Sequence, residues 1–289
     1  MKKIFTLFIS LTILILVFAG CTPSEEKAIQ WVDPTLKELV YDELDIDDTL
    51  ETTPQNFDNI KTIIIVGDDI VINPSSENSL YDLEDYLDDD DRFEKGAIKK
   101  LDDLKNFKNL SNLIVVGNDL ENIEFVKDIE SLSCLALESC NISDISPLKN
   151  CKNIEKLYLD FNNISDISPI AKWEKLPNEI SFYSNNISDI SALSARGEQV
   201  NLKYLNLGKN NIENVSPLKG FTSIDYLNLS KNNIQDASPL DKLNENSVIV
   251  LIGNPCFSDH SLGELGEFIG EQLGRFGSGL KEGFLEKYK

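Results

Sequence analysis

The sequence contains few residues of the types that carry out catalysis. His260 is its only histidine and follows Asp259, but no recognisable motif places a serine or cysteine nucleophile opposite this pair. The chain also lacks a Gly-x-Ser-x-Gly motif, a glycine-rich phosphate loop and the cysteine–histidine spacing of zinc sites. We therefore expect a protein that is not an enzyme and that needs no metal or cofactor.

A run of four aspartates, residues 88–91, is a second candidate for chemistry because carboxylates bind calcium. The run has neither the ligand spacing nor the turn glycine of an EF-hand loop. Runs of like charge usually stay in solvent. The sequence therefore favours a solvated acidic loop or a degenerate repeat unit over a calcium site, and it leaves those two alternatives open.

Composition excludes one class of partner. The chain of 289 residues has 49 Asp and Glu against 27 Lys and Arg, which gives a formal net charge of −22. Nucleic-acid binding needs clustered basic residues, so we expect no nucleic-acid partner. Hydrophobic residues make up 41% of the chain, which is enough to bury a large core.

Cys21 is a candidate for lipid attachment. Two lysines precede the apolar run 4–18, which leads into Ala-Gly-Cys21. A basic start, a short apolar stretch and small residues before a cleavage point are typical of an export signal. The run is shorter than the roughly 20 residues that a membrane-spanning helix needs. The Ala-Gly-Cys ending resembles a bacterial lipobox, in which Phe18 stands where leucine is usual.

The lipobox resemblance implies where the protein is located in the cell. The signal peptide would be residues 1–20, cleavage would precede Cys21, and residues 21–32 would form a polar tether. A diacylglyceryl group on the Cys21 thiol would anchor the exported protein to the outer face of the bacterial cytoplasmic membrane, at the cell surface. An unlipidated cysteine at the end of an ordinary secretory signal is the alternative.

Most of the remaining chain repeats one pattern, LxxLxLxxNxI. Copies return every 22–25 residues, and an earlier copy at residues 60–70, with Asp68 at the Asn position, extends the series upstream. The alternating apolar residues predict a short strand with one side in a core. Recurrent Ser-Pro segments predict tight return legs, since proline fixes φ and cannot pair in a sheet. The Asn-type positions should form an inward ladder that bonds neighbouring coils: Asn118, Cys140, Asn162, Asn185, Asn210, Asn232 and Asn254.

These repeats resemble the leucine-rich repeats of bacterial internalins, which share the 22-residue period and the IsDIsPL return leg. The resemblance implies an α/β leucine-rich repeat solenoid, with a curved parallel sheet on the concave side and short 3-10 or irregular legs on the convex side. It also implies a helical N-terminal cap at 33–59, repeats at 60–256 and an exit into a C-terminal cap. A break in the repeat period predicts an acidic insertion at about 74–100, and apolar residues at helical spacing predict that the C-terminal cap at 257–289 is helical. A partner-binding or lipid-surface helix is the alternative for this last segment.

Outward residues of successive strands should form columns on the concave face, where a partner would bind. Four of the eight tyrosines fall on this face within four consecutive coils. Tyrosine often anchors interfaces because it is large and rigid and has a polar tip, although aromatic residues also simply suit strands. We expect a binding patch of these tyrosines, a neighbouring phenylalanine and nearby charges: Tyr158, Tyr183, Tyr204, Tyr226, Phe161, Lys156, Asp160, Lys209 and Lys231.

Two further features complete the expectations. An apolar strip formed by Ile64, Val66, Ile114 and Val116 should lie beside the tyrosines, with the 74–100 insertion as its candidate cover. Four further cysteines follow Cys21: we expect Cys140 and Cys151 to be small buried residues, Cys134 to point outward and Cys256 to lie at the cap entry. No spacing compels a disulfide.

The sequence therefore predicts an exported, lipid-anchored leucine-rich repeat protein that binds another protein through its concave face. The pattern does not identify that partner, and a glycan is a weaker candidate for the same surface. The alternative function is a non-catalytic scaffold that spaces or assembles components of the cell envelope.

Overall fold

A computed structural model describes residues 27–74, 95–194, 202–244 and 246–257. The signal peptide, Cys21, the acidic run 88–91, His260 and nearly all of the expected C-terminal cap lie outside these residues. Among the described residues, none of the helices is both long and apolar enough to cross a bilayer.

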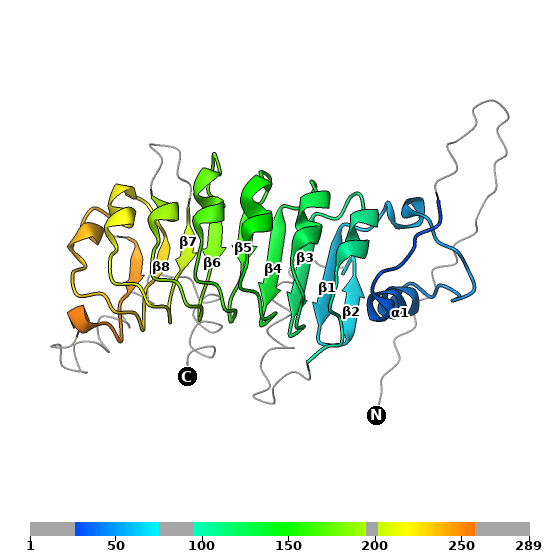
Figure 1. Cartoon of the computed structure of the whole chain (residues 1–289). Coiled ribbons are helices and arrows are strands. Elements are labelled where there is room, and N and C mark those ends of the chain that lie inside the picture. The colour runs from blue at the N-terminus through cyan, green and yellow to red at the C-terminus, as the bar shows by residue number, and fades with distance from the viewer. Residues whose placement is uncertain (1–26, 75–94, 195–201, 245, 258–289) are drawn as a thin grey trace.

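The described part of the chain is a solenoid whose concave side is one nine-stranded sheet (Figure 1). The strand order is β2-β1-β3-β4-β5-β6-β7-β8-β9, and every pairing is parallel except that of β1 with β2. The strands are β1 (Thr62–Val66), β2 (Asp69–Ile72), β3 (Asn112–Val116), β4 (Cys134–Glu138), β5 (Lys156–Tyr158), β6 (Glu179–Ser181), β7 (Tyr204–Asn206), β8 (Tyr226–Asn228) and β9 (Val248–Val250). This architecture confirms the predicted solenoid.

Short 3-10 helices form the return legs on the opposite side. They are η2 (Asp102–Asn106), η3 (Glu124–Asp128), η4 (Ser146–Asn150), η5 (Ser168–Lys172), η6 (Ser191–Leu193), η8 (Ser216–Gly220) and η9 (Ser238–Leu240). In five coils the 3-10 helix begins with a serine. The backbone N–H of this serine donates to the side chain of an Asp or Asn two residues earlier, which initiates the turn. Asp144 Oδ1 receives the N–H of Ser146 at 2.7 Å, and Asp166, Asp189, Asn214 and Asp236 repeat this bond at 2.8–2.9 Å. These bonds explain the acidic residue of the repeat.

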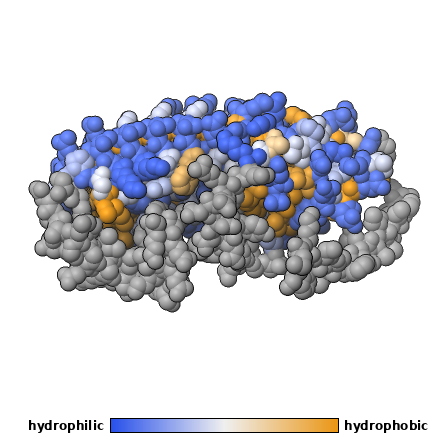
Figure 2. All heavy atoms as spheres, turned by 90° about the horizontal axis from the view of Figure 1, so that it is seen from below, coloured by the Kyte–Doolittle hydropathy of each residue, from blue (hydrophilic) through white to orange (hydrophobic). Residues whose placement is uncertain are grey.

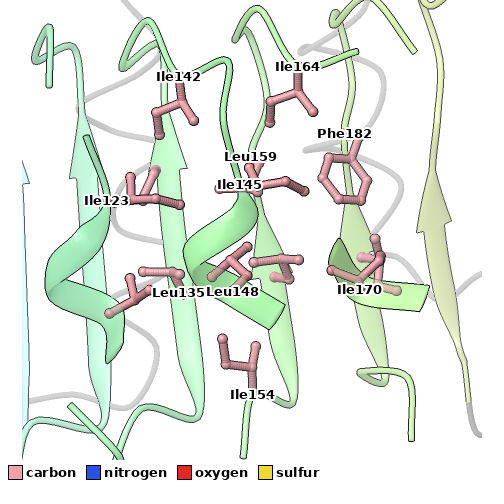
Figure 3. Close-up of a cluster of buried hydrophobic side chains, with 14 of the residues drawn as sticks. Ile123, Leu135, Ile142, Ile145, Leu148, Ile154, Leu159, Ile164, Ile170 and Phe182 are labelled. Carbon is pink, nitrogen blue, oxygen red and sulfur yellow. The ribbon is translucent and has the colours of Figure 1, made fainter. Parts of the chain in front are cut away.

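The core lies between the sheet and the return legs. Leu135 lies in β4, and Leu159 directly follows β5. Both pack with Leu148 of η4 and Ile170 of η5, and all four side chains are buried (Figure 3). Each such side chain stabilises the fold by roughly 1.5–3 kcal/mol relative to exposure. Because each coil covers only its neighbours, stability is close to a sum over adjacent coils.

A helical cap covers the first coil. The helix α1 (Pro34–Glu43) has proline in its first turn and begins after Asp33, whose side chain accepts the N–H groups of Thr35 and Leu36. A 3-10 turn, η1 (Pro54–Phe57), follows, and the Phe57 ring stacks on Phe107 with centroids 4.7 Å apart. The cap therefore joins the core of the repeats directly.

The first coil contains an insertion of 28 residues. The register pairs Thr62 with Asn112, which are 50 residues apart, whereas the next strands pair Asn112 with Cys134, which are 22 apart. The chain leaves the coil after Gly67 and first returns as β2, antiparallel to β1. In the sheet, β1 therefore pairs directly with β3 in spite of the insertion between them in the sequence.

Gly96, and not Asp68, takes the Asn position of this coil. Gly96 bridges Asn118, and the backbone N–H of Ile98 donates to Asn118 Oδ1 at 3.1 Å, as that of Ile142 donates to Asn162 in a later coil. Asp68 is exposed and instead accepts the N–H of Ala97 at 2.7 Å. The expected position of Asp68 was thus wrong, and the insertion ends at Lys95 rather than near residue 100.

Candidate functional site

The strand register sets the columns of the concave face. The first column reads Thr62, Asn112, Cys134, Lys156, Glu179, Tyr204, Tyr226, Val248, and the second reads Ile64, Ile114, Ala136, Tyr158, Ser181, Asn206, Asn228, Val250. Both columns are those that the repeat spacing predicts. The face therefore divides into an apolar half over β1, β3 and β4 and an aromatic and polar half over β6, β7 and β8.

The apolar half forms a second buried cluster, separate from the main core. Its buried members are Ile64, Ile114, Val116 and Ala136, against which Val66, Val71 and Tyr158 pack. Figure 2 shows apolar residues among the hydrophilic ones on the face of the molecule that lies below in Figure 1. Residues 75–94, most of the candidate cover, lie outside the described residues.

Cys134 lies in the first outward column but is only 3% exposed, so it is not the surface residue that its outward position suggests. Burial raises the pKa of its thiol to about 11. The same cause raises the pKa of Cys140 to about 12 and that of Cys151 to about 11. The four described cysteines are free thiols, and at neutral pH the buried ones are therefore poor nucleophiles.

Tyr158 and Lys156 share one carboxylate. The Tyr158 hydroxyl donates to Glu179 Oε2, and Lys156 Nζ lies 3.0 Å from Glu179 Oε1. Burial, reinforced by this hydrogen bond, raises the pKa of Tyr158 above its ordinary value. Tyr158 also packs on the apolar cluster. Tyr158 and Lys156, both expected to contact a partner, are therefore engaged in contacts within the protein.

The other aromatic residues form two pairs. The Tyr204 and Tyr226 rings stack with centroids 5.0 Å apart and planes 11° apart. Phe161 meets Tyr183 edge to face at 5.4 Å. Of the four, Phe161 is exposed by 43%, Tyr183 and Tyr204 are half-buried, and Tyr226 is 9% exposed. We name Phe161, Tyr183, Tyr204 and Tyr226 the aromatic patch.

Buried polar groups support the aromatic patch. The Asp160 carboxylate, 4% exposed, accepts the Ser181 hydroxyl at 2.5 Å and the Tyr183 N–H at 2.7 Å. Asn206 and Asn228, each 2% exposed, bond within their own coils. Asp160 was expected to offer a charge to a partner, but the structure uses it to brace the coil beneath Tyr183.

Gly208 allows these groups to meet, and sequence reasoning gave it no role. A Cβ at Gly208 would lie 2.8 Å from Asn228 Nδ2 and 3.0 Å from both Ser230 Oγ and the Tyr183 ring. Contacts this close would displace the ring. The only sequence signal is a glycine in an otherwise bulky outward column.

One position in every coil has a left-handed backbone. It is the residue before the Asn-type position or, in the first coil, the residue before the insertion, with φ between 53° and 80°: Gly67, Gly117, Ser139, Phe161, Ser184, Lys209, Lys231 and Gly253. In each of the first seven coils its N–H donates to a carbonyl of the next coil, as Phe161 does to Tyr183 at 2.8 Å. We name these residues the edge column, since they lie at the end of the concave strands.

The Asn-type residues lie inside the coils. Asn162 Nδ2 donates to carbonyls of Leu137, Leu159 and Asp160 at 2.7–3.1 Å, and its Oδ1 accepts the N–H groups of Cys140 and Ile142. Asn118, Asn185, Asn210, Asn232 and Asn254 make comparable bonds. The Cys140 thiol makes only longer contacts to carbonyls, at 3.2 and 3.4 Å. These side chains connect adjacent coils and face away from any ligand.

Nothing in the described part of the chain points to catalysis. Within these residues no group of three or more His, Cys, Asp or Glu side chains is placed to hold a metal ion. The arrangement offers recognition chemistry: aromatic surface on a rigid sheet, with polar groups already satisfied beneath it.

Comparison with known proteins agrees with this architecture. The family model for leucine-rich repeats in two copies matches residues 130–172 and 200–242. The chain carries leucine-rich repeats. No curated protein sequence matches it at a significant level.

Two solved structures from Listeria monocytogenes are similar to this repeat protein. An internalin (InlF) is 26% identical, with a TM-score of 0.61, over 77% of this chain and 56% of that one. Internalin C2 is 28% identical, with a TM-score of 0.57, over 76% of this chain and 93% of that one. The chain thus spans little more than half the length of the first internalin.

Proposed function

We propose that this protein is a cell-surface leucine-rich repeat lipoprotein that binds another protein through the aromatic patch. The concave sheet presents Phe161, Tyr183, Tyr204 and Tyr226 from adjacent coils. Such rigid aromatic surface yields binding energy with little loss of side-chain entropy. The similarity to internalins supports a role in protein recognition.

Phe161 carries this proposal. It is 43% exposed although it is large and apolar, and its backbone φ is 56°. A bulky residue is an outlier in this conformation, which glycine adopts freely and which three other coils fill with glycine. Strained, exposed residues concentrate at functional sites. A partner that covers the Phe161 ring accounts for a side chain that the fold alone disfavours.

Photo-cross-linking in the producing cell tests the proposal. A benzophenone amino acid replaces Phe161 in the full chain, and in a matched protein it replaces Lys172, an exposed residue of η5 on the return-leg side. We expect a discrete adduct with a protein from position 161 and not from 172. Adducts from both positions, or only from 172, would support the envelope-scaffold alternative.

Tyrosine variants show whether the adduct reports recognition. Tyr183→Ala and Tyr204→Ala should each abolish the adduct from position 161, whereas Lys149→Ala and Lys219→Ala on the return legs should not. Circular dichroism confirms that each variant is folded. Persistence of the adduct in both tyrosine variants would refute the aromatic patch as the binding surface.

The lipid anchor is a separate part of the proposal and depends on the Ala-Gly-Cys21 ending. Mass spectrometry of the membrane-extracted protein should find a diacylglyceryl group on an N-terminal Cys21. Cys21→Ala should release the protein from the membrane fraction. An unmodified mature terminus would contradict lipid anchoring and leave the binding proposal intact.

A further inference from the structure

The edge column contains two adjacent lysines whose conformation the coil imposes. Lys209 and Lys231 have φ values of 56° and 53°, and both side chains are exposed. Their N–H groups donate to Ser230 at 2.7 Å and to Ile252 at 2.8 Å, so the left-handed turn is part of the ladder between coils. Glycine adopts this turn without a Cβ penalty. Lysine at these two positions therefore carries a conformational penalty that glycine would not.

The two lysines also lie close to each other. They come from neighbouring coils, whose strands are about 5 Å apart. Across the described ranges, no ion pair joins either lysine to a carboxylate. Two ammonium groups carried by adjacent coils repel each other, and an anion bound between them would relieve that repulsion.

The carboxylates of the neighbouring coils on the concave face are already engaged. Asp160 accepts bonds from Ser181 and Tyr183, and Glu179 is shared by Lys156 and Tyr158. Although the chain has a net charge of −22, the only charged residues of the edge column are the exposed Lys209 and Lys231. Complementary charge at this rim would select an acidic partner.

We propose that Lys209 and Lys231 form a paired cationic site for acidic side chains of the protein partner, beside the apolar contact at Phe161. This inference rests on the proposed function and names the chemistry of its partner. Phe161 and Lys209 are two coils apart, which is about 10 Å along the solenoid axis. In an extended segment at roughly 3.3 Å per residue, an apolar residue and an acidic residue would be about three positions apart.

Fluorescence polarisation with labelled dodecapeptides tests this spacing and charge. The probe peptide has one leucine with two glutamates beginning three residues after it, in a Gly-Ser background, and matched peptides have glutamine or lysine in place of glutamate. We expect the glutamate peptide to bind at least fivefold more tightly than either matched peptide. Raised salt should remove this preference.

Variants of the full chain complete the test. Lys209→Gln with Lys231→Gln should bring the preference for glutamate close to onefold, whereas Lys149→Gln with Lys172→Gln should leave it unchanged. Absence of any preference, or a preference that survives in the first variant, overturns the inference. The cross-linking result from position 161 is independent, so failure of this inference is distinguishable from failure of the proposed function.

Glycine variants separate recognition from a structural role. Lys209→Gly with Lys231→Gly should relieve the left-handed strain and raise the Tm by about 2–4 °C, while the preference for glutamate is lost. A fall in Tm would show that the chain's own carboxylates hold these lysines and would overturn the inference. Lysine-dependent sedimentation with phosphatidylserine vesicles, without a peptide preference, would assign the pair to a membrane surface and overturn it as well.

Discussion

The Asp103 carboxylate accepts the backbone N–H of Asp33 at 2.9 Å, although the two residues are 70 positions apart and both are buried. Asp33 in turn accepts the N–H groups of Lys99 and Lys100 through Oδ2, at 3.0 Å each. Its Oδ1 caps α1. Two carboxylates thus connect the N-terminal cap to the first coil by charge-assisted bonds to backbone donors.

Asp103→Ala should lower the free energy of unfolding by about 3 kcal/mol, because it leaves the buried N–H of Asp33 and the partly buried N–H of Val32 without their acceptor. Urea denaturation measures this loss, followed by tryptophan fluorescence, to which Trp31 contributes from its packing against Tyr41 and Phe57 of the cap. The exposed Asp128→Ala serves as the control and should cost less than about 0.5 kcal/mol. A loss below about 1 kcal/mol for Asp103→Ala would show that the cap does not depend on this carboxylate.

The sequence was sufficient to predict the sheet register because the coils repeat. Once the pattern aligns Leu135 with Leu157, every flanking residue falls into a column, and the pairing of Cys134 with Lys156 follows. The tyrosine positions were predictable for the same reason. What the repeat could not show was which outward side chains the protein itself engages, as it does Asp160 and Tyr158.

The insertion and the cap contacts were less accessible to sequence reasoning. Gly96 does not match the Asn of the pattern, so the position where the coil resumes had no local signal. Asp68 did match the pattern by spacing but lies at a hairpin turn. The bonds of Asp33 and Asp103 join segments that the chain brings together only after the first coil forms.

Gly96→Ala should destabilise the first coil by about 2 kcal/mol. A Cβ there would lie 2.2 Å from both Asn118 Oδ1 and the carbonyl oxygen of Gly67, and the second of these is a backbone atom that cannot rotate away. Thermal unfolding measures the loss, with Ala97→Ser at the exposed neighbouring residue as the control. Equal Tm values for the two variants would contradict the assignment of Gly96 to the inward position.

Cys140→Asn should stabilise the protein by about 1 kcal/mol. It would restore the amide at the one inward position between Asn118 and Asn254 that lacks it, where the thiol makes only longer contacts with carbonyls. The new amide would donate to the carbonyl oxygen of Val115, as the amides of the other coils do to the equivalent carbonyls. A shift of the urea midpoint upward at constant m value is the expected result, and Cys151→Asn, outside the inward position, should not produce it. Destabilisation by both variants would mean that this coil is too tightly packed for the amide.

Acid should weaken the return legs through Asp166 and Asp236. The backbone N–H groups of Ser168 and Ser238, aided by their hydroxyls, hold the pKa of these carboxyls below its ordinary value. A depressed folded-state pKa contributes stability that is fully present above the unfolded value of about 3.9 and is lost as the pH falls through the folded-state value. The urea midpoint should therefore decline as the pH falls below about 4, in addition to any general acid effect. Asp166→Asn with Asp236→Asn keeps an oxygen acceptor for each turn but removes the titration, so its midpoint should fall less steeply over that range. Asp128→Asn, at an exposed carboxylate, should follow the unmodified protein, and identical slopes for all three proteins would exclude these turns as the source of acid sensitivity.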